Sequence, residues 1–281
     1  MSSPLFAYLQ YALPQHAISG LAGQLANART PWLKNFLIRK FIHAYHVDMS
    51  EAAEENPEKY QSFNEFFIRE LKPGIRPVLQ DTNDIACPVD GTVAQIGKIQ
   101  RDQLLQAKQS YFDLSTLFGG DTTLSQQFID GSFATLYLAP HNYHRIHMPV
   151  AGKLTHTIYV PGKLFSVNRM TSQIIPNLYA RNERLICCFD TEVGPMAVIL
   201  IGALIVGSMQ TVWMQQPVRH KNILSEPFSS TLCLSKNAQL GYFKLGSTVI
   251  ILFRKDKIDW SKSLQSEYNI KVGMSLGKMF L

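Results

Sequence analysis

From about residue 76 onward, short apolar runs alternate with turn-forming residues, and this pattern restricts the fold more than any other feature of the sequence. The runs are rich in Val, Ile, Thr, Tyr and Phe, and they are separated by Gly, Pro and Asn, which is typical of short antiparallel strands. We expect strands at residues 91–99, 132–138, 146–159, 185–189, 197–206 and 248–253. The pattern therefore predicts a β-rich core over residues 76–281.

The first 75 residues instead predict helices. Pro31 suits the first turn of a helix over residues 31–47, whose apolar side chains share one broad arc. The opposite arc is polar and basic, and no carboxylate side chain precedes Asp48. The apolar arc holds Leu33, Leu37, Ile38, Phe41, Ile42 and Tyr45, with Lys34 intruding, and the polar arc holds Asn35, Arg39, Lys40, His43 and His46. Such a helix either packs on its own domain or lies on an anionic membrane surface, and the residues alone leave both open.

A further helix is predicted where Ser62 and Glu65 form a capping box, and it should end near Leu71, before a Pro-Gly pair. The expected fold class is therefore α+β. Helices of residues 1–75 would pack on a mostly antiparallel core of residues 76–281.

Composition excludes several classes of protein. Hydrophobic residues make up 46% of the chain and charged residues 17%, so the chain can bury a core and is not disordered. Four cysteines without a CxxC pair predict neither a disulfide scaffold nor a zinc ribbon, and they favour a reducing compartment. The uncharged stretch 193–218 is diluted by Gly and Gln, so we expect buried strands there, not a membrane-spanning helix. No nucleic-acid partner is expected.

Three of the eight histidines, His141, His144 and His147, fall close together and are the first candidates for chemistry. Imidazole is a common metal ligand, but this spacing fits neither one helix face nor one strand face. Proton transfer is an equally good interpretation, and each histidine taken singly could be structural.

Two weaker motifs accompany the histidines. Asp90 stands in an Asp-Gly pair that is usually a turn, although a carboxylate there could orient a histidine. The Gly246-Ser247 pair lies just before an expected strand. The hydroxyl of Ser247 could attack the carbonyl of Gly246 and convert the amide into an ester.

Five segments taken together are far more specific than any of these motifs alone. They are residues 63–72 with Arg76-Pro77, residues 87–92, residues 137–149, residues 159–168 and residues 241–248. In this order they resemble the phosphatidylserine decarboxylases of the bacterial and mitochondrial type, and the resemblance covers about residues 62–281, with a similar helical start.

The resemblance implies that the chain is a proenzyme that cuts itself between Gly246 and Ser247. A large fragment, 1–246, and a small fragment, 247–281, would then stay associated. By motif, Asp90, His147 and Ser247 would form the triad for this cut, with His147 taking the hydroxyl proton and Asp90 holding and charge-stabilising the imidazole.

The resemblance also implies the cofactor and the reaction. Ser247 would become a covalent pyruvoyl group, which forms a Schiff base with the amine of phosphatidylserine and accepts electrons as carbon dioxide leaves, giving phosphatidylethanolamine. No metal is implied. His144 is the favoured proton donor for the product, and His141 is the fallback. One departure from the family pattern is Gln239, which stands where a glutamate is usual.

A two-chain lipid substrate implies docking on an anionic membrane surface. The resemblance implies a peripheral protein on the cytoplasmic face of the bacterial inner membrane, and it leaves open whether the protein is a homodimer. Two competing hypotheses remain from the residues alone. One is a metal-dependent hydrolase that uses His141, His144 and His147, and the other is a peripheral membrane-binding module without activity.

Overall fold

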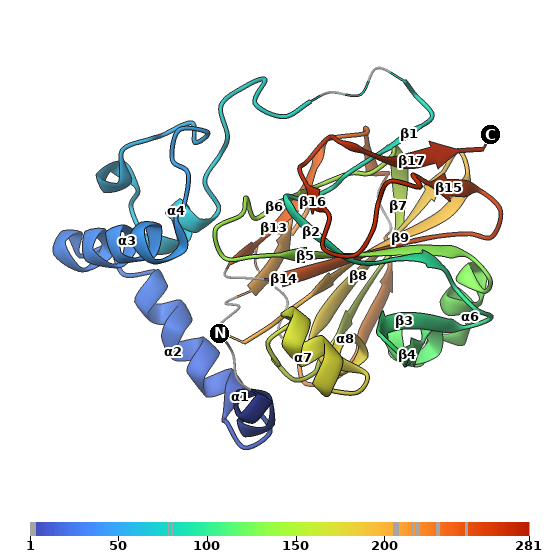
Figure 1. Ribbon diagram of the computed structural model, residues 1–281, viewed down its shortest axis with the longest axis horizontal. Helices are drawn as coiled ribbons and strands as arrows, with labels where there is room; N and C mark the ends of the chain where they lie inside the picture. Colours follow the sequence, from blue (N-terminus) through green and yellow to red (C-terminus); the bar gives the residue numbers. More distant parts are fainter. Residues whose placement is uncertain are drawn as a thin grey trace.

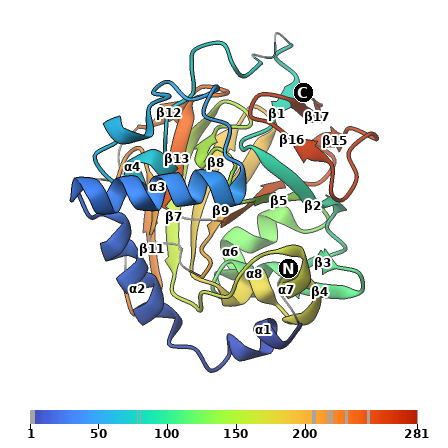
Figure 2. The ribbon, with the colours of Figure 1, turned by 60° about the vertical axis from the view of Figure 1, so that its left-hand side comes forward.

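The computed structural model describes residues 4–77, 79, 81–204, 208–214, 216, 220–228, 231–244 and 247–280. It confirms the α+β class: helices at the N-terminal end lie along one side of a mostly antiparallel β core (Figures 1 and 2). The helical segments before the core are α1 (Pro4–Leu9), α2 (Gln15–Ala26), α3 (Pro31–Tyr45), a 3-10 turn η1 (Pro57–Lys59) and α4 (Phe63–Phe67).

The core is built on a large antiparallel sheet of nine strands. Its strands run in the order β11 (Leu224–Pro227), β7 (Gly152–Val160), β8 (Arg184–Thr191), β9 (Gly194–Ile201), β14 (Ser247–Phe253), β5 (Ser132–Leu138), β2 (Gly91–Lys98) and β16 (Asn269–Ile270), and β12 (Cys233–Leu234) also pairs with β7. Because β14 pairs with β9 on one side and with β5 on the other, it lies inside the sheet.

Two small sheets cover one face of the large sheet. They are β1 (Asp84–Ala86), β17 (Ser275–Met279) and β15 (Ile258–Trp260) in one, and β10 (Ser208–Thr211), β13 (Gln239–Lys244) and β6 (Arg145–His147) in the other. Their apolar side chains join those of Leu138, Val249 and Ile251 in one buried cluster.

Short helices and a hairpin cover the opposite face. They are β3 (Gln103–Ala107), β4 (Ser110–Asp113), α5 (Leu114–Leu117), α6 (Thr122–Ser125), η2 (Gln126–Phe128), α7 (Arg169–Ile174) and α8 (Leu178–Arg181). Ile250 and Leu252 point into this second cluster, so side chains of β14 alternate between the two faces.

Helix α3 packs its apolar arc on its own domain. Ile38 is fully buried, and Phe41 contacts the rings of Phe63, Phe66 and Phe67. The intruding Lys34 is also buried, and its ammonium donates to the side chain of Asn35 and to the carbonyl of Glu58. Packing on the domain thus accounts for the apolar arc, while the basic arc stays exposed.

Two boundary predictions were wrong. The expected strand 146–159 is divided into β6 and β7, which belong to different sheets, because a turn at residues 148–151 contains Pro149. Helix α4 begins as predicted, with Ser62 accepting from the backbone N–H of Glu65 at 3.2 Å, but it ends at Phe67. The backbone of Ile68 leaves the helical conformation, and Leu71 forms an isolated β-bridge with Ala52.

The uncharged stretch contributes buried strands, as predicted. Strand β9 lies inside the large sheet and β10 lies in a small one. The predicted strand 197–206 is too long, because β9 ends at Ile201 and residues 202–204 are not in a strand, while Val206 falls outside the described residues. Every helix within the described ranges is too short or too polar to cross a membrane.

Candidate active site

Ser247 is the first residue of β14 and lies directly opposite Leu138 of β5. It is 1% exposed, and its hydroxyl has no hydrogen-bond partner among the described residues. Its phase along the strand matches that of Val249, so its side chain faces the small sheet that contains β6. Gly246, the other residue of the predicted cleavage site, lies outside the described residues.

His147 ends β6 on this same face of the large sheet, and its ring is held at both nitrogens. Nδ1 lies 2.8 Å from the carbonyl oxygen of Asn237, and Nε2 lies 3.2 Å from the hydroxyl of Tyr143. A carbonyl can only accept, so Nδ1 carries the proton and Nε2 is the basic nitrogen.

The electrostatic environment keeps His147 neutral. Burial lowers the pKa of its imidazole below the usual value, and the positive charge of Arg145 adds to this. The hydrogen bond to Asn237 and, more weakly, the charge of Asp90 act in the opposite direction without reversing the shift. Nε2 is thus the basic nitrogen, and its one lone pair accepts from Tyr143, so it can take a proton from another hydroxyl only when that hydrogen bond opens.

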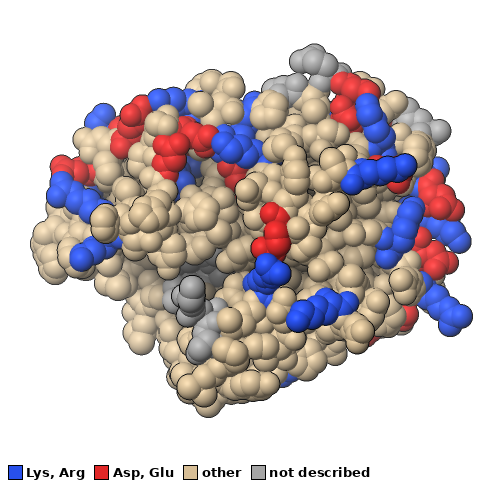
Figure 3. Space-filling view, viewed as in Figure 1, with Lys and Arg blue, Asp and Glu red and all other residues tan. Residues whose placement is uncertain are grey.

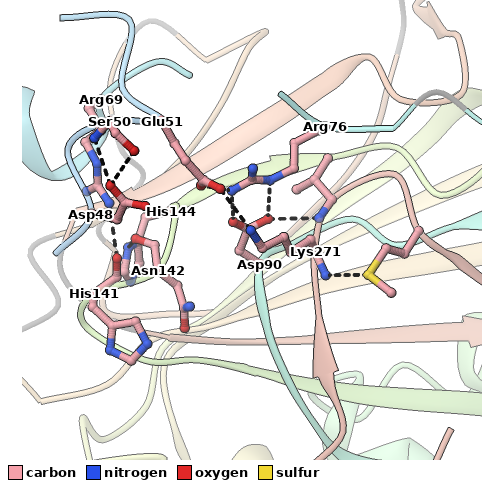
Figure 4. Close-up of polar contacts among 12 residues, drawn as sticks. Asp48, Ser50, Glu51, Arg69, Arg76, Asp90, His141, Asn142, His144 and Lys271 are labelled. Carbon is pink, nitrogen blue, oxygen red and sulfur yellow. Dashed lines mark hydrogen bonds and ion pairs between the residues drawn. The ribbon is translucent and has the colours of Figure 1, made fainter. Parts of the chain in front are cut away.

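Asp90 is held by an arginine and a backbone amide, and no hydrogen bond joins it to His147. Nε of Arg76 donates to Oδ1 of Asp90 at 3.0 Å, Nη2 donates to Oδ2, and the N–H of Val272 donates to Oδ1 at 2.9 Å (Figure 4). The structure links Asp90 to His147 indirectly, because the N–H of His147 donates to the carbonyl of Pro88 in the same turn.

The close approach of the backbone at position 91 to β5 explains why this turn contains a glycine. A Cβ atom there would lie 2.1 Å from the carbonyl oxygen of Tyr137 on β5. Only a residue without a side chain lets the backbone after Asp90 approach β5 this closely, so the Asp-Gly pair positions the carboxylate at the edge of the large sheet.

The network around Arg76 extends to both ends of the chain. Nη2 of Arg76 also donates to Glu51 at 2.6 Å, and Lys271 donates to the same carboxylate at 2.9 Å. The hydrogen bond from Arg76 is the main reason that the pKa of Glu51 is lowered to about 2. Residues of the helical region, the core and the last 35 residues therefore meet at one cluster of charges (Figure 4).

His144 is fully buried beside this cluster, and its ring lies 4.0 Å from that of Phe67. Its Nδ1 donates to the carbonyl of Asn142 at 2.8 Å, and its Nε2 has no partner among the described residues. Burial, followed by the nearby charge of Arg69, lowers the pKa of His144 to about 3. His144 is therefore neutral, and it can give a proton from Nε2 only after accepting one.

Arg69 is a buried cation without a carboxylate partner among the described residues. It is 5% exposed, and one N–H group donates to the carbonyl of His141 at 3.1 Å (Figure 4). Its guanidinium lies 5.5 Å from the ring centre of Phe66, and no described residue accepts a hydrogen bond from its Nε or Nη1. Its charge is directed at the segment that contains the histidines. The side chain of His141 itself is exposed.

Two cavities flank these residues. One, of about 280 Å³, is lined by Arg76, Tyr143, Arg145, His147 and Gln239. In this cavity, Nη1 of Arg145 donates to the side-chain oxygen of Gln239 at 2.9 Å. The same nitrogen lies 3.0 Å from a carboxylate oxygen of Glu70.

The other cavity, of about 400 Å³, lies beyond the Asp90-Gly91 turn. It is lined by Tyr137, His141 and Asn142 from the core and by Arg169 of α7, with Lys108 and Glu267 at its edge. Helix α1 packs against α7, so this cavity lies close to the N-terminal helices (Figure 2).

Within the described ranges, no hydrogen bond joins any two members of the predicted triad. Ser247 has the phase of Val249, which packs in one buried cluster with Ile146 of β6, whereas His147 alternates with Ile146 along β6 and lines the smaller cavity. Asp90 is paired with Arg76, and His144 lies closer to α4. Among the described residues, no three His, Cys, Asp or Glu side chains are placed to hold a metal ion, so the hydrolase hypothesis gains no support.

Sequence analysis did not single out Tyr143, Arg69 or the carbonyl of Asn237. Tyr143 and Arg69 lie within segments that carried the family resemblance, which was the available signal. Asn237 has a left-handed backbone conformation, with φ of 66°, that turns its carbonyl toward His147, and the sequence gives no direct sign of this contact.

Comparison with known proteins adds a consistent result. A family model described as phosphatidylserine decarboxylase matches residues 63–278, and a second model described as PSD matches residues 5–46. A phosphatidylserine decarboxylase proenzyme of Saccharophagus degradans is 45% identical and covers 99% of both chains. A proenzyme of the same name from Legionella pneumophila strain Lens is 49% identical over 94% of each chain. The one from Methylococcus capsulatus is 48% identical over 97% of this chain and 96% of its own.

Proposed function

This chain belongs to the phosphatidylserine decarboxylase family, and we propose that it cuts itself before Ser247 and then decarboxylates phosphatidylserine to phosphatidylethanolamine at a membrane surface. The observation that carries the proposal is the hydroxyl of Ser247. In a chain so similar to named proenzymes, this serine is buried, begins an internal strand and has no hydrogen-bond partner for its hydroxyl among the described residues. A serine hydroxyl can attack the carbonyl of the residue before it and convert the amide into an ester.

The proposed cut begins with a proton transfer to His147. As the hydroxyl oxygen of Ser247 bonds to the carbonyl carbon of Gly246, its proton passes to Nε2 of His147, the nitrogen that carries none in this structure. The amide C–N bond then breaks, and the proton goes to the new amine. The carboxylate of Asp90 is assigned to this step because its charge favours the imidazolium that forms.

Breakdown of the ester then yields the proposed pyruvoyl group. Elimination releases the carboxylate of Gly246 and leaves dehydroalanine, and addition of water with loss of ammonia leaves a ketone. The serine in this chain fits that origin, because its buried hydroxyl makes no hydrogen bond to the described part of the chain that its conversion would break. The pyruvoyl group supplies an electron sink for the loss of carbon dioxide.

His144 is proposed to move the protons of the decarboxylation. Its unprotonated Nε2, which has no partner in the described part of the chain, can take the proton that the ammonium group of the substrate must lose and can return that proton to the α-carbon. His141 is the fallback, since it lines the larger cavity and is exposed.

The larger cavity is the proposed site for the lipid head group. It contains both signs of charge, with Lys108, Arg169 and Glu267 at its edge, and a phosphoserine head group also carries both signs. Its position beside α7 and α1 would let a lipid enter from the side of the N-terminal helices.

The N-terminal helices are the proposed membrane contact, with residues 1–75 as the membrane-contacting region. Before Arg29 the chain has no charged side chain, and large apolar residues of α1 to α3 are exposed. These are Leu5, Tyr8, Leu9, Leu21, Leu25, Trp32 and Phe36, which we call the apolar helical surface. Figure 3 shows few charged side chains over α1 and α2 in this view. Exposed apolar surface beside the basic arc of α3 suits an anionic bilayer.

We propose a peripheral location on the cytoplasmic face of the bacterial inner membrane. The substrate and the anionic membrane surface would be the partners of the cleaved enzyme, whose two fragments stay associated.

Intact mass spectrometry of the freshly purified protein tests the proposal. We expect fragments 1–246 and 247–281, the smaller one lighter than its simple hydrolysis product by the mass of one ammonia. The Ser247→Ala variant is the control and should remain a single chain of 31.7 kDa. A wild-type chain that stays uncut after incubation with anionic vesicles would overturn the proposal.

A further inference from the structure

We propose that Glu51, a residue of the helical region, is a positioning residue for Asp90: it fixes the two groups that donate hydrogen bonds to the carboxylate of Asp90. The inference rests on the proposed function, in which Asp90 supports self-cleavage, and it assigns a role to a residue outside the predicted triad. The region proposed to contact the membrane thereby also contributes to the self-cleavage site.

The backbone around Glu51 is held by the segment that follows α4. The N–H of Lys72 donates to the carbonyl of Glu51 at 2.9 Å. The next residue, Ala52, forms a β-bridge with Leu71. The carboxylate of Glu51 therefore extends from a backbone that is fixed at two adjacent residues, and its side chain is only 26% exposed.

The carboxylate of Glu51 contacts both segments that hold Asp90. Nη2 of Arg76, which also donates to Asp90, lies 2.6 Å from Oε2 of Glu51. Nζ of Lys271 donates to Oε1 of Glu51 at 2.9 Å, and the next residue, Val272, donates its N–H to Asp90 at 2.9 Å. Within the described part of the chain, all hydrogen bonds to the carboxylate of Asp90 come from Arg76 and Val272 (Figure 4). Glu51 thus acts on every one of them.

The charges of this cluster balance when Glu51 is ionised. Arg76 and Lys271 carry two positive charges, and Asp90 and Glu51 carry two negative charges. Because the pKa of Glu51 is lowered to about 2, its carboxylate stays ionised at neutral pH. Without that charge, the two cations repel each other at a site where the side chain of Arg76 is only 11% exposed. Lys271 then moves away, and Val272 moves with it.

Hydrogen exchange in the uncut protein is the first readout. In the Ser247→Ala precursor, the amide of Val272 is protected by its hydrogen bond to Asp90. We expect Glu51→Gln to speed the exchange of this amide about tenfold, because the segment loses its ion pair with the helical region. The amide of Met279 has a backbone partner elsewhere and is the internal reference, so its exchange rate should not change.

Two further variants separate positioning from a general loss of stability. Asp81 also pairs with a lysine of the proposed small fragment, Lys278, but these side chains are 45% and 53% exposed. Asp81→Asn is therefore the matched control and should leave the exchange of Val272 unchanged. Lys271→Gln removes the other partner of Glu51 at a side chain that is 56% exposed, and it should also speed the exchange. Equal acceleration of the reference amide would show a structural role and overturn the inference, as would unchanged exchange at Val272.

The rate of self-cleavage tests the role of Glu51 in the reaction. Precursor kept unfolded in urea is refolded by dilution, and the cut is followed on denaturing gels. We expect Glu51→Gln to cut about tenfold more slowly than wild type, because Asp90 is no longer held in place. Asp81→Asn should cut at the wild-type rate. The same variants combined with Ser247→Ala show the folding rate by tryptophan fluorescence.

The comparison of the two rates decides the outcome. Slower cutting at an unchanged folding rate supports the inference. Glu51→Gln cutting as fast as wild type, or more slowly only in proportion to its folding, overturns it and leaves the proposed function standing. A wild-type chain that never cuts counts against the proposed function, and the exchange of Val272 still decides whether Glu51 positions Asp90.

Discussion

At the scale of single residues, Arg76 connects two carboxylates that come from different parts of the chain. It donates two hydrogen bonds to Asp90 and one to Glu51, and the side chains of Arg76 and Asp90 are only 11% and 7% exposed. Removing the guanidinium would leave both carboxylates without their main cation. Breaking a buried ion pair by deleting one partner costs far more than breaking an exposed one.

We therefore expect Arg76→Met to destabilise the Ser247→Ala precursor by about 3 kcal/mol in urea unfolding. The matched control is Arg39→Met, which removes an exposed pair with Glu58 and should cost less than about 0.5 kcal/mol. Equal losses in the two variants would mean that the Arg76 network does not stabilise the fold.

His144 gives a pH dependence of stability with a definite sign. Its pKa is lowered to about 3 in the folded chain, chiefly by burial, so below pH 6.5 the unfolded chain binds a proton that the folded chain does not. The free energy of unfolding therefore falls as the pH falls from 6.5 toward 3. His144→Phe in the Ser247→Ala precursor should reduce this slope by up to about 1.4 kcal/mol per pH unit. Urea unfolding at pH 6.0 and 4.5 measures it, and identical slopes would exclude a buried neutral His144.

Candidate residues for the site could be named at this scale, because the histidines, Asp90 and Ser247 stand in recognisable motifs, and their roles stay predictions. The pairing of those groups could not. Spacing along the chain does not show that Arg76 would bind Asp90, or that a backbone carbonyl would hold His147. Both contacts depend on turns whose geometry follows from packing.

At the scale of elements, the small sheet that carries His147 depends on close backbone contact. A Cβ atom on Gly241 of β13 would lie 2.3 Å from the carbonyl oxygen of Gln210 on β10. Gly241→Ala should therefore separate these strands and cost about 1–3 kcal/mol. Gly20 of α2 has open space around it, so Gly20→Ala should instead add about 0.5–1 kcal/mol. Thermal unfolding of both variants tests the contrast, and a stable Gly241→Ala protein would contradict it.

Helix α2 gives a prediction for membrane binding. Leu21 and Leu25 are 68% and 47% exposed, one turn apart, on a helix without charged residues. Replacing both with Asp should weaken flotation with anionic vesicles at least tenfold, because two charges would enter the apolar helical surface. Ile129 is 41% exposed and belongs to the β-rich part of the chain, outside the apolar helical surface. The Ile129→Asp variant should therefore float with the vesicles like wild type. Unchanged flotation of the α2 variant would remove α2 from the membrane contact.

The sequence pattern predicted long strands well, but it did not predict short strands or the ends of helices. The strands in the large sheet were predicted because β-branched and other apolar residues extend over seven or eight residues in β2, β5 and β14, and the last two strands are buried almost throughout. Strand β6 has three residues and was merged with β7, since Met148, Val150 and Ala151 around Pro149 are apolar and do not resemble a turn. The end of α4 was missed because the bridge between Leu71 and Ala52 has no signal in the sequence of the helix itself.

At the scale of the whole molecule, the proposed small fragment cannot leave easily after the cut. It supplies β14 inside the large sheet, β17 between β1 and β15, and β16 at the edge. The two fragments should therefore elute together in size exclusion without denaturant and separate in concentrated urea. Elution of fragment 247–281 alone from the native protein would contradict this arrangement.

Strand β14 is hydrogen-bonded on both sides from its first residues, and this has a consequence for how the protein matures under the proposed cut. The scissile amide meets its base only after distant strands have assembled, so a copy that misfolds never acquires its ketone. Only a chain that has folded completely is then activated, and the change in its covalent structure is permanent. Two separately translated pieces could rebuild the same sheet, yet they would lack the amide whose rupture makes the cofactor. An unbroken chain is needed only for the self-cleavage, and the mature enzyme works without it.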